Sequence, residues 1–173
     1  TVNCYGINGT RIARQRSGNN PQLDRYFSSR IDEMDPNANI IFIFGGTNDF
    51  GHGDAPIGDF NDRTVDTFYG ALHVLYTKMI EKYPEATIVV ATPLHRINEY
   101  SLYIDGVDKK HYTPLAKYVD IIKEVACYYS LPVCDLYAIS GLQPEVPVIK
   151  EKYIPDGLHP NDAGHEILAQ KIA

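Results

Sequence analysis

The sequence predicts an α/β fold, a single-domain doubly wound parallel sheet with helices on both of its faces. Apolar runs of strand length alternate along the chain with stretches whose apolar residues recur at helical spacing. No internal repeat or low-complexity linker divides the 173 residues, and their composition is 44% hydrophobic and 22% charged, as in ordinary globular domains. We therefore expect residues 1–173 to form one domain.

Four segments have the character of strands. Residues 39–44 form an uninterrupted apolar run closed by Gly45 and Gly46, which is typical of a parallel strand buried on both faces. Residues 87–93 and 131–137 follow as shorter runs. Residues 1–5 are expected to be the end of a further strand.

Helical patterns fill the intervals between these strands. Residues 64–83 are amphipathic, with His73 expected at the helix surface or boundary, and a second helix is expected to begin at Thr113 and Pro114. Asn161 is placed to cap a last helix over residues 162–173. Short helical pieces are expected at 10–16 and 21–31. Residues 49–61, 94–112 and the proline-containing stretch before Asp156 are expected to be loops, and the complete arrangement to be a flavodoxin-like three-layer α/β/α sandwich.

Charge and hydropathy exclude several classes of function. The formal net charge is −6 and the Lys and Arg residues are scattered, so we expect no nucleic-acid partner. No apolar run is long enough to span a membrane. Cys4, Cys127 and Cys134 show no C-x-x-C spacing and are expected to be buried free thiols, which favours the cytoplasm. The sequence starts at Thr1 and not at Met, so it leaves secretion open, and it does not determine the oligomeric state.

Asp49, His52 and Asp54 lie close together in a glycine-rich stretch. Such a group can hold a metal ion, but acidic clusters in glycine-rich loops are more often solvated turns. We therefore expect no metal site.

The segment from Asp156 to Asn161 carries the clearest chemistry. Pro160 favours an extended conformation for His159, which places the imidazole on a stiff loop just before the last helix. Asp156 lies three residues earlier, and a carboxylate held against one imidazole nitrogen fixes the tautomer that a general base needs. The alternative is a surface turn in which the two side chains only cap backbone groups.

Two further motifs are expected at the same edge of the sheet, after residues 1–5 and after residues 39–44. They offer a backbone N–H at Gly9 and a side-chain amide at Asn48. With His159 as the base and Asp156 as its orienting acid, these donors complete a set that suits acyl transfer, because they can stabilise an oxyanion.

These motifs resemble the blocks of the SGNH (GDSL-type) esterase and lipase superfamily. Gly6-Ile-Asn-Gly9-Thr is similar to its second block, Gly46-Thr-Asn48-Asp49 to its third and Asp156-Gly-Leu-His159-Pro-Asn to its fifth, in the same order over nearly the whole chain. The resemblance implies that Gly9 and Asn48 complete the oxyanion hole and that Asp156 and His159 belong to a catalytic triad. It also implies that Gly45 and Thr47 shape the loop, and that neither metal nor organic cofactor is needed.

The sequence departs from the superfamily at the nucleophile, because the N-terminal Gly-Asp-Ser block is absent. None of the serines follows Gly-Asp or ends a predicted strand: Ser17, Ser28, Ser29, Ser101, Ser130 and Ser140. In the superfamily the strand carrying that serine is central, and omitting a central strand leaves a gap of roughly 10 Å with unpaired backbone on both sides. We therefore expect the nucleophile, a serine, on a segment before Thr1.

The expected function is hydrolysis of small acyl esters, and acetylated carbohydrates are candidate substrates. A lipase, thioesterase or transacylase using the same site is the first alternative. A catalytically silent ligand-binding domain of the same fold is the second. The loop residues Asp49, His52, Tyr100 and Tyr103 are candidates for the lining of the pocket.

Overall fold

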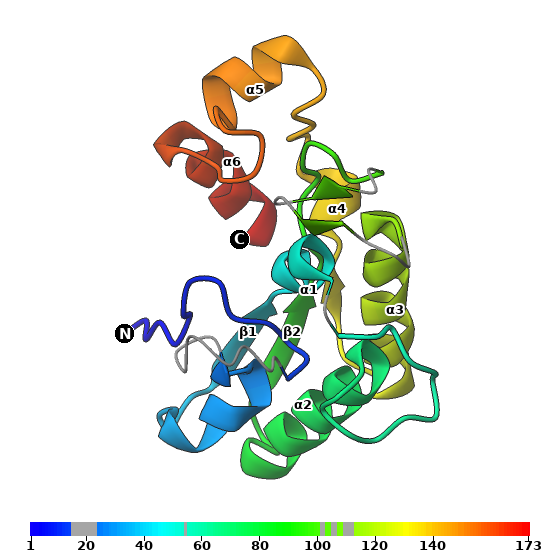
Figure 1. Cartoon of the computed structure of the whole chain (residues 1–173). Coiled ribbons are helices and arrows are strands. Elements are labelled where there is room, and N and C mark those ends of the chain that lie inside the picture. Colours follow the sequence, from blue (N-terminus) through cyan, green and yellow to red (C-terminus); the bar gives the residue numbers. More distant parts are fainter. Residues whose placement is uncertain (15–23, 54, 101–102, 105–106, 109–112) are drawn as a thin grey trace.

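A parallel sheet forms the centre of the molecule (Figure 1). The structure is a computed structural model that describes residues 1–14, 24–53, 55–100, 103–104, 107–108 and 113–173. The described sheet has the order β1-β2-β5, with β1 at Ile40–Phe44, β2 at Thr87–Ala91 and β5 at Val133–Cys134. All pairs are parallel, which confirms the predicted α/β class.

Helices occupy both sides of this sheet. Helices α2 and α3 pack against each other on one side, while α6 lies on the other (Figure 1). None of the helices in the described ranges is both long and apolar enough to cross a bilayer. The bounds of the helices are Phe27–Glu33 for the 3-10 helix η2, Thr47–His52 for α1, Phe68–Lys82 for α2, Leu115–Tyr128 for α3, Leu136–Ile139 for α4, Pro147–Tyr153 for α5 and Asp162–Ile172 for α6. A two-stranded antiparallel hairpin, β3 (Tyr103–Ile104) and β4 (Val107–Asp108), follows β2.

The hydrophobic core has two unequal parts. The larger part lies between one face of the sheet, with Ile41 and Val90 among its residues, and the apolar stripes of α2 and α3. The smaller part joins Ala91 at the end of β2 to Leu136 and to Leu168 of α6. The carboxyl end of β2 therefore lies beside α6.

Strand β1 is buried on one face only, so the expectation of burial on both faces is wrong. Its burial alternates along the strand, and the outward side chains of Ile40, Phe42 and Phe44 are 73%, 38% and 41% exposed. The reason is that α6 and its neighbours cover the sheet near β2 and β5, while no described element covers the outward face of β1.

The predicted strand at residues 1–5 is not formed. Thr1 to Cys4 are exposed and have no regular secondary structure in the described chain. A strand needs a neighbour to satisfy its backbone groups, and no described strand lies beside this segment. The segment is instead fixed by side chains, since the Tyr5 hydroxyl accepts a hydrogen bond of 2.9 Å from the backbone N–H of Asp35.

Several predictions of short helices and of loops were also wrong. Residues 10–14 form no helix, and residues 15–23 lie outside the described part of the chain. Residues expected in loops form α1 and α5, and α5 begins at Pro147, which is compatible with the first turn of a helix.

Two burial predictions also failed. His73 is fully buried and not at the helix surface, because an aromatic cluster that includes Phe60 and Tyr129 encloses its ring. The free thiols of Cys4 and Cys127 are exposed and that of Cys134 is half-buried.

Candidate active site

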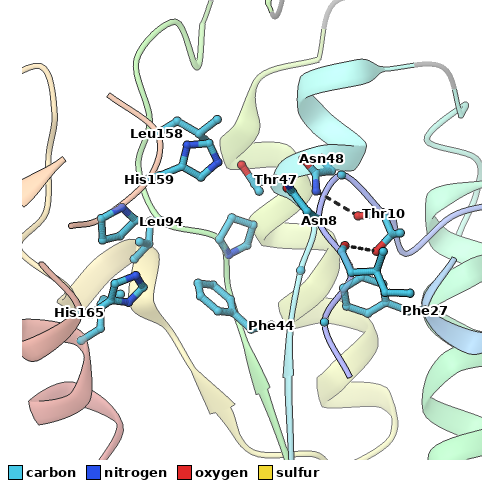
Figure 2. Close-up of a pocket in the computed structure, with 18 residues that line it drawn as sticks. Asn8, Thr10, Phe27, Phe44, Thr47, Asn48, Leu94, Leu158, His159 and His165 are labelled. Carbon is cyan, nitrogen blue, oxygen red and sulfur yellow. Dashed lines mark hydrogen bonds between the residues drawn. The ribbon is translucent and has the colours of Figure 1, made fainter. Parts of the chain in front are cut away.

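A pocket of about 560 Å³ opens at the carboxyl ends of β1 and β2 (Figure 2). This is the edge at which open α/β sheets bind their ligands. Three of the four predicted site residues, Gly9, Asn48 and His159, line this pocket. The lining comes from residues 6–10, 44–48, 93–94 and 158–160, with Phe27, His165 and Leu168.

The fourth predicted residue, Asp156, contacts the pocket through His159. One carboxylate oxygen, Oδ2, lies 2.7 Å from His159 Nδ1. The other oxygen, Oδ1, accepts the backbone N–H groups of Leu158 at 2.8 Å and His159 at 2.7 Å. The same carboxylate therefore shapes the turn and orients the imidazole, so the predicted pair is present in a single loop.

The hydrogen bonds to Asp156 keep its carboxyl group ionised. Desolvation raises the pKa of this carboxyl group, but the hydrogen bonds from the backbone and imidazole of His159 and from Leu158 outweigh it and lower the pKa to about 2. An ionised carboxylate only accepts hydrogen bonds, so Nδ1 carries the hydrogen and Nε2 of a neutral imidazole keeps its lone pair. The His159 side chain is 71% exposed, which leaves the ring accessible.

Asn48, near the start of α1, is joined directly to the loop that carries Gly9. Asn48 Nδ2 donates a hydrogen bond of 3.1 Å to the carbonyl oxygen of Thr10, the residue after Gly9 (Figure 2). Gly9 has φ of 75° in a tight turn, which the Thr10 N–H closes onto the Ile7 oxygen at 3.2 Å. The side-chain amide of Asn48 and the backbone around Gly9 are therefore held in a fixed relation on one wall of the pocket.

Asp49 has a structural role that the sequence reasoning missed. Its carboxylate is 2% exposed and accepts the backbone N–H groups of Ile12 at 3.0 Å and Ala13 at 2.9 Å. Burial raises its pKa to about 6, although these hydrogen bonds and the charge of Arg11 lower it. Asp49 therefore fixes the segment after Gly9 against α1, and its partners are too distant in sequence to be found from a local pattern.

Gly46 sets the start of α1, and with it the direction of Thr47 and Asn48. Its φ is 104°, a conformation that favours glycine, and an added Cβ would lie 3.0 Å from Ile122 and 3.2 Å from Pro93. The glycine at this position therefore lets the backbone lie close to α3 and to the segment after β2, and Gly45 and Thr47 line the pocket beside it.

The other candidates for the lining are placed elsewhere. Asp49, His52 and Tyr100 do not line the pocket, and the side chain of Tyr103 lies outside the described part of the chain. Among the described residues, no group of three or more His, Cys, Asp and Glu side chains is arranged to hold a metal ion. Asp54 lies outside the described residues.

Several lining residues were not predicted. Phe44 and Leu94 line the pocket because they lie at the carboxyl ends of β1 and β2, and Phe27 comes from η2. His165 and Leu168 come from α6, where Asn161 caps the helix by accepting the Gly164 N–H at 3.0 Å. The predicted cap at Asn161 already placed His165 in the first turn of this helix, close to His159, so its position at the pocket could have been inferred from the sequence.

No described serine lines the pocket. Ser28, Ser29, Ser130 and Ser140 are all absent from its lining, while Ser17 and Ser101 lie outside the described residues. Thr10 and Thr47 are the hydroxyl side chains in the lining, and the Thr10 hydroxyl donates to the Ile7 carbonyl at 2.7 Å.

Comparisons with known proteins identify a family and similar folds for this chain. A family model described as the GDSL-like Lipase/Acylhydrolase family matches residues 1–167. No significant match was found among curated proteins. One crystal structure is similar with 35% identity and a TM-score of 0.83, covering 95% of this chain and 74% of that chain.

Two further solved structures have the same fold. A protein from Lactobacillus plantarum is similar with 27% identity and a TM-score of 0.82, again covering 95% of this chain and 74% of that chain. An acetyl xylan esterase, AlAXEase, is similar with 20% identity and a TM-score of 0.60, covering 96% of this chain and 76% of that chain.

Proposed function

Because this chain belongs to the GDSL-like lipase/acylhydrolase family, a family of ester-bond hydrolases, we propose that it is a serine esterase acting on small acyl esters, with acetylated carbohydrates among its substrates. One observation carries the proposal. The Asp156 carboxylate lies 2.7 Å from His159 Nδ1, which leaves Nε2 as the nitrogen that can accept a proton, and the pocket beside it also contains Asn48 and Gly9.

In the first half of the reaction, His159 Nε2 takes the proton of a serine hydroxyl while the serine Oγ attacks the ester carbonyl. The negative charge that develops on the carbonyl oxygen is stabilised by the Gly9 N–H and the Asn48 amide. Asp156 stabilises the imidazolium. The C–O bond to the alcohol then breaks, and His159 returns the proton to the departing alcohol.

In the second half, water replaces the alcohol. His159 takes a proton from the water, whose oxygen attacks the acyl-serine carbonyl, and the same two donors stabilise the second oxyanion. Cleavage of the acyl–serine bond releases the carboxylic acid, and the serine recovers its hydrogen from His159. No metal or organic cofactor takes part in this scheme.

None of the described serines lines the pocket, and the open side of β1 supports one location for the nucleophile. β1 pairs with β2 on one edge, and no described strand occupies the other edge. A parallel strand placed there would end at the pocket, because β1 itself ends at Phe44 in the pocket lining. We propose that such a strand carries the serine on a segment before Thr1.

The pocket favours a small acyl group. Its 560 Å³ is within the range of small-molecule sites, and the end of the proposed strand would take part of that volume. The side chains of Phe44, Leu94 and Leu158 make the remaining wall apolar. We propose a short acyl chain because the end of the proposed strand would narrow the space beside this apolar part of the wall.

The test is labelling of the full-length gene product with a serine-reactive fluorophosphonate, read by intact mass and peptide mapping. We expect one covalent adduct on a serine outside residues 1–173, and loss of that adduct in His159→Ala. His165→Ala is the matched control, because His165 also lines the pocket but lies apart from the Asp156 turn.

The absence of an adduct from the active preparation, or an adduct unaffected by His159→Ala, would contradict the proposal. Complete lack of labelling and turnover would favour the silent binding domain. A substrate panel of acetyl, butyryl and octanoyl esters, an acyl thioester and an acyl acceptor separates the esterase from a lipase, a thioesterase and a transacylase.

A further inference from the structure

A tight turn formed by residues 95–99, the His95–Glu99 turn, follows β2 and is closed by a buried carboxylate. Glu99 is 3% exposed, and its Oε1 lies 3.0 Å from His95 Nδ1. Its carboxylate also accepts the Arg96 N–H at 3.3 Å and the Tyr137 hydroxyl at 3.3 Å. The backbone oxygen of Glu99 accepts the Leu115 N–H at 3.2 Å, which fixes the turn to the start of α3.

One side of this turn contacts the loop that carries Asp156 and His159. The Ile97 N–H donates to the Gly157 oxygen at 2.9 Å. The Ile97 side chain packs so closely that a Cβ added at Gly157 would lie 2.6 Å from its Cγ2. Gly157 has φ of 80°, so both its conformation and its contact require glycine.

The other side contacts α1, whose first turn carries Asn48. Arg96 is 3% exposed, and its Nη1 donates to the Thr47 carbonyl oxygen at 3.4 Å. Its guanidinium group lies over the Phe50 ring, 5.5 Å from the ring centroid, in α1. Thr47 directly precedes Asn48, so Arg96 contacts the backbone that orients the amide.

We propose that the His95–Glu99 turn is a positioning element that sets the distance between His159 and Asn48. Adjacent residues of the turn, Arg96 and Ile97, contact α1 and the loop that carries His159, and the buried carboxylate of Glu99 fixes their relation. The role in turnover rests on the proposed esterase function, because the base and the oxyanion donor must reach the same ester group. A displacement of about 1 Å between such groups can cost about a hundredfold in rate.

The first variant is Glu99→Gln in the full-length gene product. A Gln amide replaces one acceptor oxygen with a donor, so it cannot accept all three hydrogen bonds. We expect kcat for a short acyl ester to fall about tenfold to a hundredfold, while KM stays within about threefold. We also expect the imidazole ¹⁵N signals of His159 and the side-chain amide signal of Asn48 to shift in NMR spectra.

The second variant, Ile97→Ala, removes the contact with Gly157 without touching a charged group. Ile80→Ala is its matched control, because Ile80 is a half-buried isoleucine of α2 that packs on the main core. We expect Ile97→Ala to shift the His159 signals and lower kcat, and Ile80→Ala to lower stability alone. If Glu99→Gln does not fold, this pair of variants decides the question.

Unchanged His159 and Asn48 signals, with kcat within twofold of the wild type in the folded variants, would overturn the positioning role. An equal loss of kcat in Ile97→Ala and Ile80→Ala, with no shift in the signals, would overturn it as well. A wild-type protein that hydrolyses no ester would overturn the esterase proposal separately. The NMR comparison would then still test the positioning role, since it needs no turnover.

Discussion

Asn48 and Asp49 are adjacent in the first turn of α1 but have different surroundings. Asn48 faces the pocket and donates to the Thr10 oxygen, whereas Asp49 is buried and accepts the N–H groups of Ile12 and Ala13. Both side chains therefore hold the segment after Gly9. Substitution of Asn48 should impair mainly turnover, and substitution of Asp49 should alter mainly stability.

Substitution of Asn48 should affect turnover more than stability. Asn48→Ala removes one oxyanion donor, and kcat is expected to fall by a factor on the order of 10²–10³. Asn8→Ala, which removes another amide from the pocket lining, is the control in the same steady-state assay. A change of less than threefold in the Asn48 variant would remove this residue from the oxyanion site.

Substitution of Asp49 should alter the pH dependence of stability. Its pKa is about 6 in the folded protein against 3.8 as the ordinary value, so between these pH values the folded state binds the proton that the unfolded state releases. The contribution of this group to stability therefore decreases as pH rises from about 4 to 6.

The comparison that isolates this effect is the free energy of unfolding of the wild type and of Asp49→Asn, each measured in urea at pH 4 and pH 7. The wild type should lose on the order of 2 kcal/mol more than the variant over this interval. Asp59→Asn, in an exposed turn, should behave as the wild type. Equal losses in all three proteins would show that Asp49 does not titrate in this range.

Among the elements, α6 depends on its cap and contributes two residues to the pocket. Asn161 Oδ1 accepts the Gly164 N–H at 3.0 Å, and Asn161 Nδ2 donates to the Lys152 oxygen at 2.8 Å at the end of α5. The cap therefore joins α5 to α6 immediately after His159.

Removal of this cap should cost stability. Asn161→Ala is expected to lower the free energy of unfolding by about 1–2 kcal/mol, measured by urea denaturation. Asn37→Ala, in an exposed turn held by Asp35, should change it by less than about 0.5 kcal/mol. If the two variants were equally stable, the hydrogen bonds of Asn161 would have no net effect.

The regular elements were predictable because their signals are local. The apolar run of β1, the stripe of α2 and the cap of α6 each lie within one stretch of sequence, as do Asp156 and His159. Position 73 was misjudged because its burial depends on the rings of Tyr128 and Tyr129 at the end of α3, more than fifty residues away. Helix α1 was missed because its short sequence contains Gly51, which disfavours a helix.

For the whole molecule, the outward face of β1 is the most unusual surface. Ile40, Phe42 and Phe44 are exposed together beside an edge without a described strand partner. Exposed strand edges and apolar patches both promote association between chains.

A polypeptide limited to residues 1–173 should therefore self-associate. Phe42→Thr should reduce this association without a large loss of stability, because Phe42 is already 38% exposed. Sedimentation velocity over a concentration series measures the effect. Ile139→Thr, which changes an exposed side chain of α4, is the control. Identical sedimentation of the two variants would show that this face does not mediate association.

The pairing of Asp156 with His159 inside a single turn has a consequence for folding and inheritance. Only two residues separate the partners, so bringing them together costs very little chain entropy and requires no distant part of the sheet. The acid and the base can therefore form their contact early in folding, and a gene rearrangement that moved the C-terminal segment would move both together. Gly9 and Asn48, in contrast, are distant from this turn in sequence, so only the tertiary structure brings them to the same pocket as His159.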